Sequence, residues 1–87
     1  MVIPKLYEIE DVPLDEKIIH QKWEIPYLDF YWLIAEIDPK EQLAFGYANL
    51  NNDENAEWGY ISLDELRENG AMPVEDWKPT KYKDIEK

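Results

Sequence analysis

The stretch Asp29–Leu50, "DFYWLIAEIDPKEQLAFGYANL", decides the fold. Its first part, residues 29–37, has large apolar side chains at both odd and even positions. A strand that is apolar on both faces belongs in the middle of a sheet that is covered on both sides. Asp38 and Pro39 then favour a chain reversal, and residues 43–50 alternate bulky side chains with Ala and Gly. The stretch therefore predicts an antiparallel hairpin that contains a central strand.

Further strands are predicted on both sides of this hairpin. Residues 17–25, "KIIHQKWEI", alternate so that Ile19, Trp23 and Ile25 would share one face of a half-buried strand that ends at Pro26. Residues 57–61, "EWGYI", are typical of a short strand.

A helix is predicted directly after this strand. Ser62 and Glu65 form the capping-box pattern, and Ile61 and Leu66 stand where a hydrophobic staple would join them. The Asn-Gly pair that follows is a C-terminal stop signal. A helix over residues 62–69 is too short to be stable alone in water, so its leucines must pack on the sheet.

These elements predict an α+β fold: an antiparallel meander of about four strands, one short capped helix over residues 62–69, and packed terminal segments. Eighty-seven residues suffice for one hydrophobic core. We expect a single domain over residues 1–87, with a packed arm (1–16), a sheet-plus-helix body (17–77) and a surface tail (78–87).

The chain is strongly acidic, with 20 Asp and Glu against 9 Lys and Arg and a formal net charge of -11. The whole excess lies in residues 1–70. Affinity for phosphates comes from Lys and Arg, so this charge disfavours direct binding to nucleic acid. It favours a basic protein partner or a cation, and it also serves solubility.

The chain has no cysteine, which excludes disulfides, thiolate metal sites and thiol nucleophiles. No apolar stretch is long enough for a membrane span, and the start lacks the pattern of a signal peptide. We therefore expect a cytoplasmic protein without membrane contact.

Four stretches together resemble the family called domain of unknown function 2958, small uncharacterised proteins of bacteria, archaea and mobile elements. The stretches are "KLYEIEDVPLDEKIIHQKW", "FYWLIAEIDPKEQLAFGYANL", "EWGYISLDEL" and "VEDWKPTKYKDI". The residues that match the family pattern are Leu6, Tyr7, Ile19, His20, Trp32, Glu36, Phe45, Gly46, Gly59, Tyr60, Ser62, Leu63, Glu65 and Leu66. The resemblance supports the fold and implies no activity, substrate or cofactor.

Aromatic residues on the predicted strands are candidates for an interaction surface. Trp and Tyr dominate protein interfaces because their polar tips tolerate partial exposure. The alternative is that they form the core, which a small domain needs. The interaction candidates are Tyr31, Trp32, Tyr47, Trp58 and Tyr60, together with Glu36.

His20, Glu24 and Glu36 are candidates for acid–base chemistry. A histidine and a carboxylate that converge in a concave place can transfer protons. No nucleophile, Gly-rich phosphate loop or second histidine accompanies them in the sequence. A surface or packing role for His20 is the competing interpretation.

The acidic loop over residues 51–57 could hold a calcium ion, because oxygen-bearing side chains stand at every other position. The EF-hand template is not met, since Ala56 replaces its glycine and Ser62 its final glutamate. A plain hairpin loop is the competing interpretation. The candidate ligands are Asn51, Asp53, Asn55 and Glu57.

The sequence favours a small non-catalytic interaction or accessory protein that binds a basic protein partner. Two alternatives stay open. One is a divalent-cation-binding or hydrolytic protein that uses loop 51–57 or His20, Glu24 and Glu36, and the other is an acidic inhibitor that imitates DNA. No cofactor is expected other than a divalent cation such as calcium.

Overall fold

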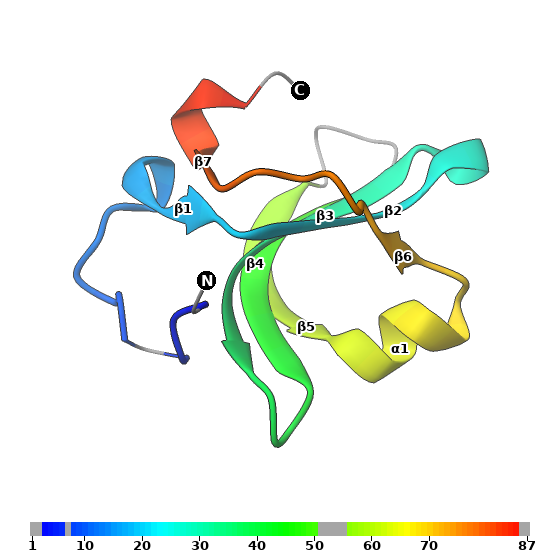
Figure 1. Ribbon diagram of the computed structural model, residues 1–87, viewed down its shortest axis with the longest axis horizontal. Helices are drawn as coiled ribbons and strands as arrows, with labels where there is room; N and C mark the ends of the chain where they lie inside the picture. Colours follow the sequence, from blue (N-terminus) through cyan, green and yellow to red (C-terminus); the bar gives the residue numbers. More distant parts are fainter. Residues whose placement is uncertain (1–2, 7, 51–55, 86–87) are drawn as a thin grey trace.

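The structure is a computed structural model that describes residues 3–6, 8–50 and 56–85. Two antiparallel sheets, one short α-helix and several single 3₁₀ turns make up the described chain (Figure 1). The elements are η1 (Leu14–Glu16), β1 (Ile18–Ile19), β2 (Gln21–Ile25), η2 (Pro26–Leu28), β3 (Phe30–Asp38), β4 (Leu43–Leu50), β5 (Glu57–Ser62), α1 (Leu63–Glu68), β6 (Met72–Pro73), β7 (Thr80–Lys81) and η4 (Tyr82–Asp84).

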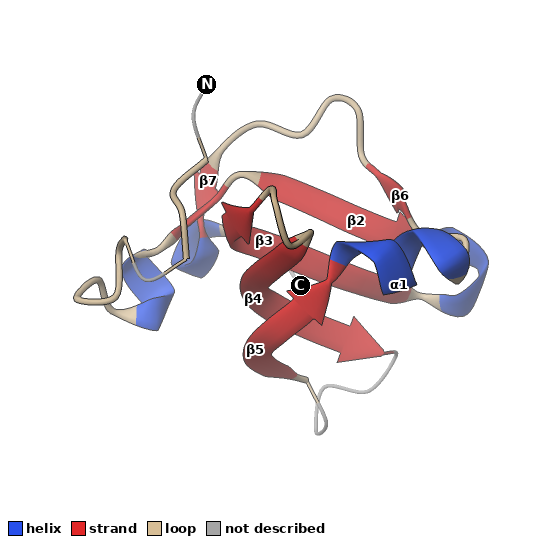
Figure 2. Ribbon diagram, turned by 90° about the horizontal axis from the view of Figure 1, so that it is seen from below, coloured by secondary structure: helices blue, strands red, loops and turns tan. Residues whose placement is uncertain are grey.

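The main sheet has five strands in the order β5-β4-β3-β2-β6, and all its pairs are antiparallel (Figure 2). Strands β2 to β5 form the predicted meander, and β3 lies at its centre. The short β6 adds a fifth strand at the outer edge of β2, because the chain returns there after α1. The predicted α+β class and the central position of β3 are confirmed.

The predicted reversal between β3 and β4 is made by the Asp38 side chain. Its Oδ1 accepts hydrogen bonds from the backbone N–H groups of Lys40 (3.1 Å) and Glu41 (3.3 Å). Gln42 then takes a left-handed conformation with φ 52° before β4 begins. An Asp side chain that satisfies the backbone of a turn is a common way to close a hairpin.

One face of the sheet, which we call the helix face, is covered by α1. The Ser62 Oγ accepts a hydrogen bond from the Glu65 N–H at 3.3 Å, as the capping box predicts. Gly70, with φ 86°, ends the helix in the left-handed region. The buried residues of this face are Trp23, Ile25, Trp32, Ile34, Ala44, Ile61, Leu63, Leu66 and Ala71.

Gly46 allows β4 to approach β3 closely. A Cβ atom added at Gly46 would clash with the Leu33 carbonyl oxygen and would lie 3.1 Å from the Ile34 Cα. Both contacts are with backbone atoms, which cannot turn aside as a flexible side chain can. Glycine is therefore required here by space, and its absent side chain brings the two central strands together.

The opposite face, which we call the terminus face, is covered by the C-terminal segment. Trp77 donates a hydrogen bond from its Nε1 to the Ile19 carbonyl at 3.0 Å, and β7 pairs with β1. Tyr82 and Ile85, which belong to the expected surface tail 78–87, pack on this face. Its buried residues are Ile19, Leu33 and Ala35, with Tyr31, Tyr47, Trp58, Trp77, Tyr82 and Ile85 packed against them.

The predicted strand 17–25 is interrupted at His20. β1 pairs with β7 in the small sheet, whereas β2 pairs with β3 and β6 in the large one. Ile19 therefore packs on the terminus face, while Trp23 and Ile25 pack on the helix face. The expectation that these three share a face is wrong, because alternation holds only within a continuous strand.

The described residues of the N-terminal arm, 3–6 and 8–16, lie beside β3 and the C-terminal segment. The Ile37 N–H donates to the Pro4 carbonyl at 2.9 Å, in the part of β3 that pairs with β4 and extends beyond the pairing with β2. Glu16 forms ion pairs with Lys81 (3.2 Å) and Lys83 (2.6 Å). The hydrogen bond from Lys83, followed by that from Lys81, lowers the pKa of Glu16. Within the described ranges, no helix has the length and apolarity to cross a membrane.

Candidate functional site

A cavity of about 420 Å³ lies between the N-terminal arm and the sheet, and we call it the arm cavity. Its volume falls in the range of about 300–1,000 Å³ that is usual for ligand pockets. One wall is the arm segment 10–14, and the others come from η1, β3, β4 and β5. The sheet side is lined by Lys17, Glu36, Phe45 and Tyr60.

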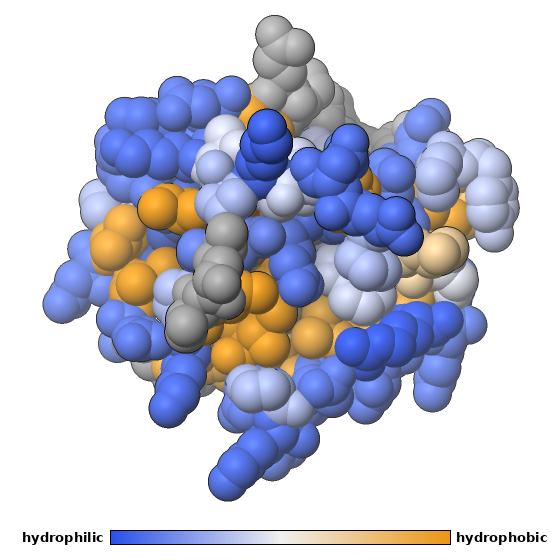
Figure 3. Space-filling model, viewed as in Figure 1, coloured by the Kyte–Doolittle hydropathy of each residue, from blue (hydrophilic) through white to orange (hydrophobic). Residues whose placement is uncertain are grey.

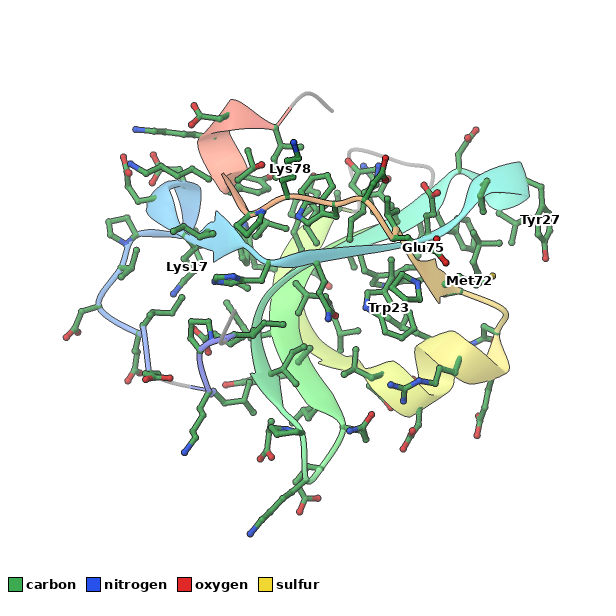
Figure 4. The ribbon with its side chains drawn as sticks, viewed as in Figure 1. Lys17, Trp23, Tyr27, Met72, Glu75 and Lys78 are labelled. Carbon is green, nitrogen blue, oxygen red and sulfur yellow. The ribbon has the colours of Figure 1, made fainter. Side chains whose placement is uncertain are left out.

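Lys17 is buried at the floor of this cavity, with only 3% of its surface exposed. It ends η1, and its side chain extends from the start of β1 into the space enclosed by the arm (Figure 4). Its Nζ donates a hydrogen bond to the Ile9 carbonyl at 2.7 Å and lies 3.5 Å from Glu36 Oε2. Lys17 therefore connects the arm to the sheet.

Glu36 is turned toward Lys17 by an irregularity in β3. The register between β3 and β4 shifts between Ile34 and Glu36, so Ile34 faces Gly46 and Glu36 faces Phe45. A β-bulge re-aims the side chains that follow it. The carboxylate of Glu36 is buried, as is the ammonium of Lys17, and an ion pair is the arrangement that makes such burial tolerable.

Aromatic rings form the side of the cavity that faces β5. The Phe45 ring lies 5.5 Å from that of Tyr60 in an edge-on arrangement, and 5.7 Å from that of Trp58 in a stacked one. The Lys17 Nζ lies 5.9 Å from the centre of the Phe45 ring. Tyr60 keeps 55% of its surface exposed and stands at the opening. The cavity thus combines a buried ion pair with π faces.

Three of the aromatic candidates continue along the same face away from the cavity. Tyr47 lies 6.1 Å from Trp58 and 6.4 Å from Tyr31, measured between ring centres. Tyr82 of η4 packs over them, 5.1 Å from Tyr47 and 4.9 Å from Trp58. Partial burial raises the pKa of Tyr82, and a hydrogen bond with Tyr47 acts in the opposite direction without cancelling this rise. The C-terminal segment therefore covers part of the expected interaction surface.

Trp32 lies on the helix face and is separated from the other aromatic candidates by the sheet itself. It is 9% exposed, and its ring meets Phe30 edge-on at 6.4 Å. The structure thus brings together Tyr31, Tyr47, Trp58 and Tyr60, and it places Trp32 among the core residues around α1.

The structure does not bring Glu24 to Glu36. Glu24 faces Tyr31 across the β2–β3 pair, and Tyr31 precedes Glu36 by five residues, which corresponds to roughly 16 Å along a strand. Glu24 lies 4.0 Å from Lys22. His20 lies at the β1–β2 junction, where its backbone N–H donates to the Ile34 carbonyl at 2.8 Å. Burial lowers the pKa of His20.

Most of the predicted calcium loop lies outside the described residues. The candidate ligands Asn51, Asp53 and Asn55 lie there, whereas the fourth candidate, Glu57, is exposed at the start of β5. Among the residues that the structure describes, no group of three or more His, Asp and Glu side chains is placed to hold a metal ion.

A second cavity, of about 290 Å³, lies at the end of the helix face. It is lined by Ile25, Leu28, Phe30, Trp32, Leu50 and Asn69. None of these described lining residues is charged, which distinguishes this cavity from the arm cavity.

Comparison with known families gives one match, over residues 13–75, to the family described as protein of unknown function (DUF2958). The chain belongs to this family. The DUF2958 match runs from the residue before η1 to just beyond β6, so it contains the meander and α1. Comparison with curated proteins and with solved structures found no match.

The DUF2958 match includes the sheet side of the arm cavity and stops short of much of its outer wall. Lys17, Glu36, Phe45 and Tyr60 lie within it, whereas residues 10–12 lie before it. Sequence reasoning missed the role of Lys17. The available signal was a lysine directly beside an apolar pair, but its burial depends on Ile9 and Glu36, which no local pattern connects to it.

Proposed function

We propose that this DUF2958 protein is a non-catalytic interaction protein whose acidic surface binds a basic protein partner. The net charge of -11 supports this, because complementary charge steers association and selects partners. The family match brings no activity that would favour an enzyme.

The observation that carries the proposal is the pairing of basic side chains with carboxylates of the same chain. Most of them are engaged with carboxylates of the same chain: Lys17 with Glu36, Lys22 with Glu24, Arg67 with Asp64, and both Lys81 and Lys83 with Glu16. Many other carboxylates stand exposed on the surface, among them Glu10, Asp11, Glu68, Glu75 and Asp76. The surface that remains for a partner is therefore negative.

The alternative of a hydrolytic or cation-binding protein receives less support. The carboxylates of Glu24 and Glu36 lie apart, and Glu36 is paired with Lys17. The DNA-mimic alternative shares the acidic surface with the proposal. It differs in the partner, which would be a protein that binds nucleic acid.

Affinity capture with the tagged protein in lysate of its own host tests the proposal. We expect a basic protein to be retained at low salt and released at high salt, because screening weakens the attraction between exposed charges. The variant Glu68→Gln/Glu75→Gln/Asp76→Asn should retain less of it. The charge-preserving variant Glu68→Asp/Glu75→Asp/Asp76→Glu should retain as much as the unchanged protein.

Two results would contradict the proposal. One is a capture that contains no basic protein specific to this chain. The other is a captured protein whose retention is the same with both variants and at both salt concentrations.

A further inference from the structure

We infer that the arm cavity binds an arginine side chain of the basic partner. This inference rests on the proposed function and goes beyond it, because it names the residue that the partner supplies and the place where that residue binds. The site consists of the Phe45 and Tyr60 rings, the Lys17–Glu36 ion pair and the arm carboxylates of Glu10 and Asp11.

The cavity is large enough for one long side chain and is open to solvent. Its volume is about 420 Å³. Tyr60 on β5 and Leu14 on η1 both line the space, and each is about half exposed. The molecular face that carries the arm shows apolar patches between hydrophilic side chains (Figure 3).

The charges of the lining favour a cation. At the floor, Lys17 and Glu36 neutralise each other across 3.5 Å, and Lys17 is also held by the Ile9 carbonyl. The charges that remain belong to Glu10 and Asp11, both on the exposed arm. An anion would meet these carboxylates and the field of the whole chain, which carries -11.

The rings favour a guanidinium among cations. Phe45 already has one cation near its face, the Lys17 ammonium at 5.9 Å, while Tyr60 presents a ring at the opening. A guanidinium is planar and weakly hydrated, so it stacks on aromatic rings and also donates paired hydrogen bonds to carboxylates. A lysine ammonium is a strongly hydrated point charge and loses more on entering a largely apolar space.

An NMR titration with three short blocked peptides tests the site. The peptides are identical except for one central residue, which is arginine, lysine or citrulline, the neutral isostere of arginine. We expect saturable shifts of the Phe45 and Tyr60 amides and of residues 10–14 with the arginine peptide, in the millimolar range. Citrulline should bind about tenfold more weakly because it lacks the charge.

Charge variants separate the site from the general acidity of the chain. Glu10→Gln/Asp11→Asn should weaken the arginine peptide about tenfold. Glu68→Gln/Glu75→Gln removes the same charge from α1 and the chain after β6, and it should change the affinity less than about twofold. Glu75 lies well to the right of Lys17 in Figure 4, near β6.

Ring variants test the stacking. Tyr60→Ala should weaken the arginine peptide severalfold, because it removes the ring at the opening. Tyr27→Ala is the matched control, since Tyr27 is 82% exposed and lies far from Lys17 (Figure 4). Equal affinity for arginine and citrulline, equal effects of the two charge variants, or shifts away from the arm cavity would each overturn the inference.

The two proposals can fail separately. If a basic partner is captured and Glu10→Gln/Asp11→Asn leaves its affinity unchanged, the arginine site is wrong and the proposed function stands. If the arginine peptide binds as expected and no salt-sensitive basic partner is found, the proposed function is wrong and the site stands.

Discussion

The two faces of the central sheet are built in different ways. The helix face is filled by apolar side chains and is covered by α1, which directly follows β5 in the chain. The terminus face carries aromatic rings and a buried ion pair, and its cover comes from the two ends of the chain. There, Trp77 reaches Ile19 and Lys83 reaches Glu16 across most of the sequence. The difference shows that one thin sheet can combine a locally encoded core with a cavity assembled from distant segments.

The variant with the largest expected effect on stability is one that breaks the ion pair of the terminus face. Glu36→Gln leaves the Lys17 ammonium buried without its carboxylate, so we expect a loss of about 3–5 kcal/mol in the free energy of unfolding. Urea denaturation of the purified variant measures this loss.

The double variant Lys17→Met/Glu36→Leu is the control for that experiment. Replacing both members of a buried pair by apolar residues of similar size is often neutral or stabilising. We therefore expect the double variant to recover most of the lost stability. A Glu36→Gln variant as stable as the unchanged protein would mean that the pair is not buried as described.

Gly46→Ala tests the close approach on which both faces depend. The added methyl group would clash with the Leu33 carbonyl oxygen, so β4 must shift away from β3. Overpacking of this kind costs about 3 kcal/mol, and thermal unfolding should show it. Gly59→Ala is the matched control because, among the described residues other than Gly59 and its two chain neighbours, no atom lies within 4 Å of the added Cβ. Equal losses from the two substitutions would refute the steric explanation.

Ser62→Ala tests the locally encoded face and should have a smaller effect. It removes the hydrogen bond from the Glu65 N–H to Ser62 Oγ, at a cost of about 1 kcal/mol. Urea denaturation is sensitive enough to measure this, and Ser62→Asn should restore most of the stability because Asn also caps helices well. An unchanged free energy of unfolding would show that the cap contributes nothing.

The smallest expected effect is a pH dependence from His20, which lies at the junction between the two sheets. Burial lowers the pKa of His20 below 6.5, so the folded chain favours the neutral imidazole. The unfolded chain then binds more protons between the two pKa values. Stability should be complete above pH 6.5 and should fall as the pH drops through the lowered pKa.

Denaturation measured across this pH range tests the His20 effect. His20 is the only histidine of the chain, so His20→Gln should flatten the profile there. A slope that persists in His20→Gln would assign the pH dependence to other groups.

The success of prediction from the sequence also differs between the two faces. The hairpin turn at Asp38 and the capped helix after Ser62 were predicted because their signals lie within a few residues of each other. The break at His20 was missed, because it arises when β1 and β2 pair with different distant strands.

The arm cavity was not predicted from the sequence. Glu36 and Tyr60 were candidates, but the sequence placed Trp32 with them and left out Lys17 and Phe45. The β3 register shift before Glu36 turns this carboxylate toward Lys17. Such a shift depends on how two strands pair, which the alternation of either strand alone does not reveal.

The burial of Lys17 has a practical consequence for following the arm. An amine-reactive acylating reagent meets Lys78 at the surface at all times, whereas Lys17 is enclosed and held by the Ile9 carbonyl (Figure 4). The reagent reaches Lys17 only while the arm is lifted, so the ratio of the two labelling rates reports how often it lifts. The Lys17 side chain is thus a natural probe of the local opening of the arm.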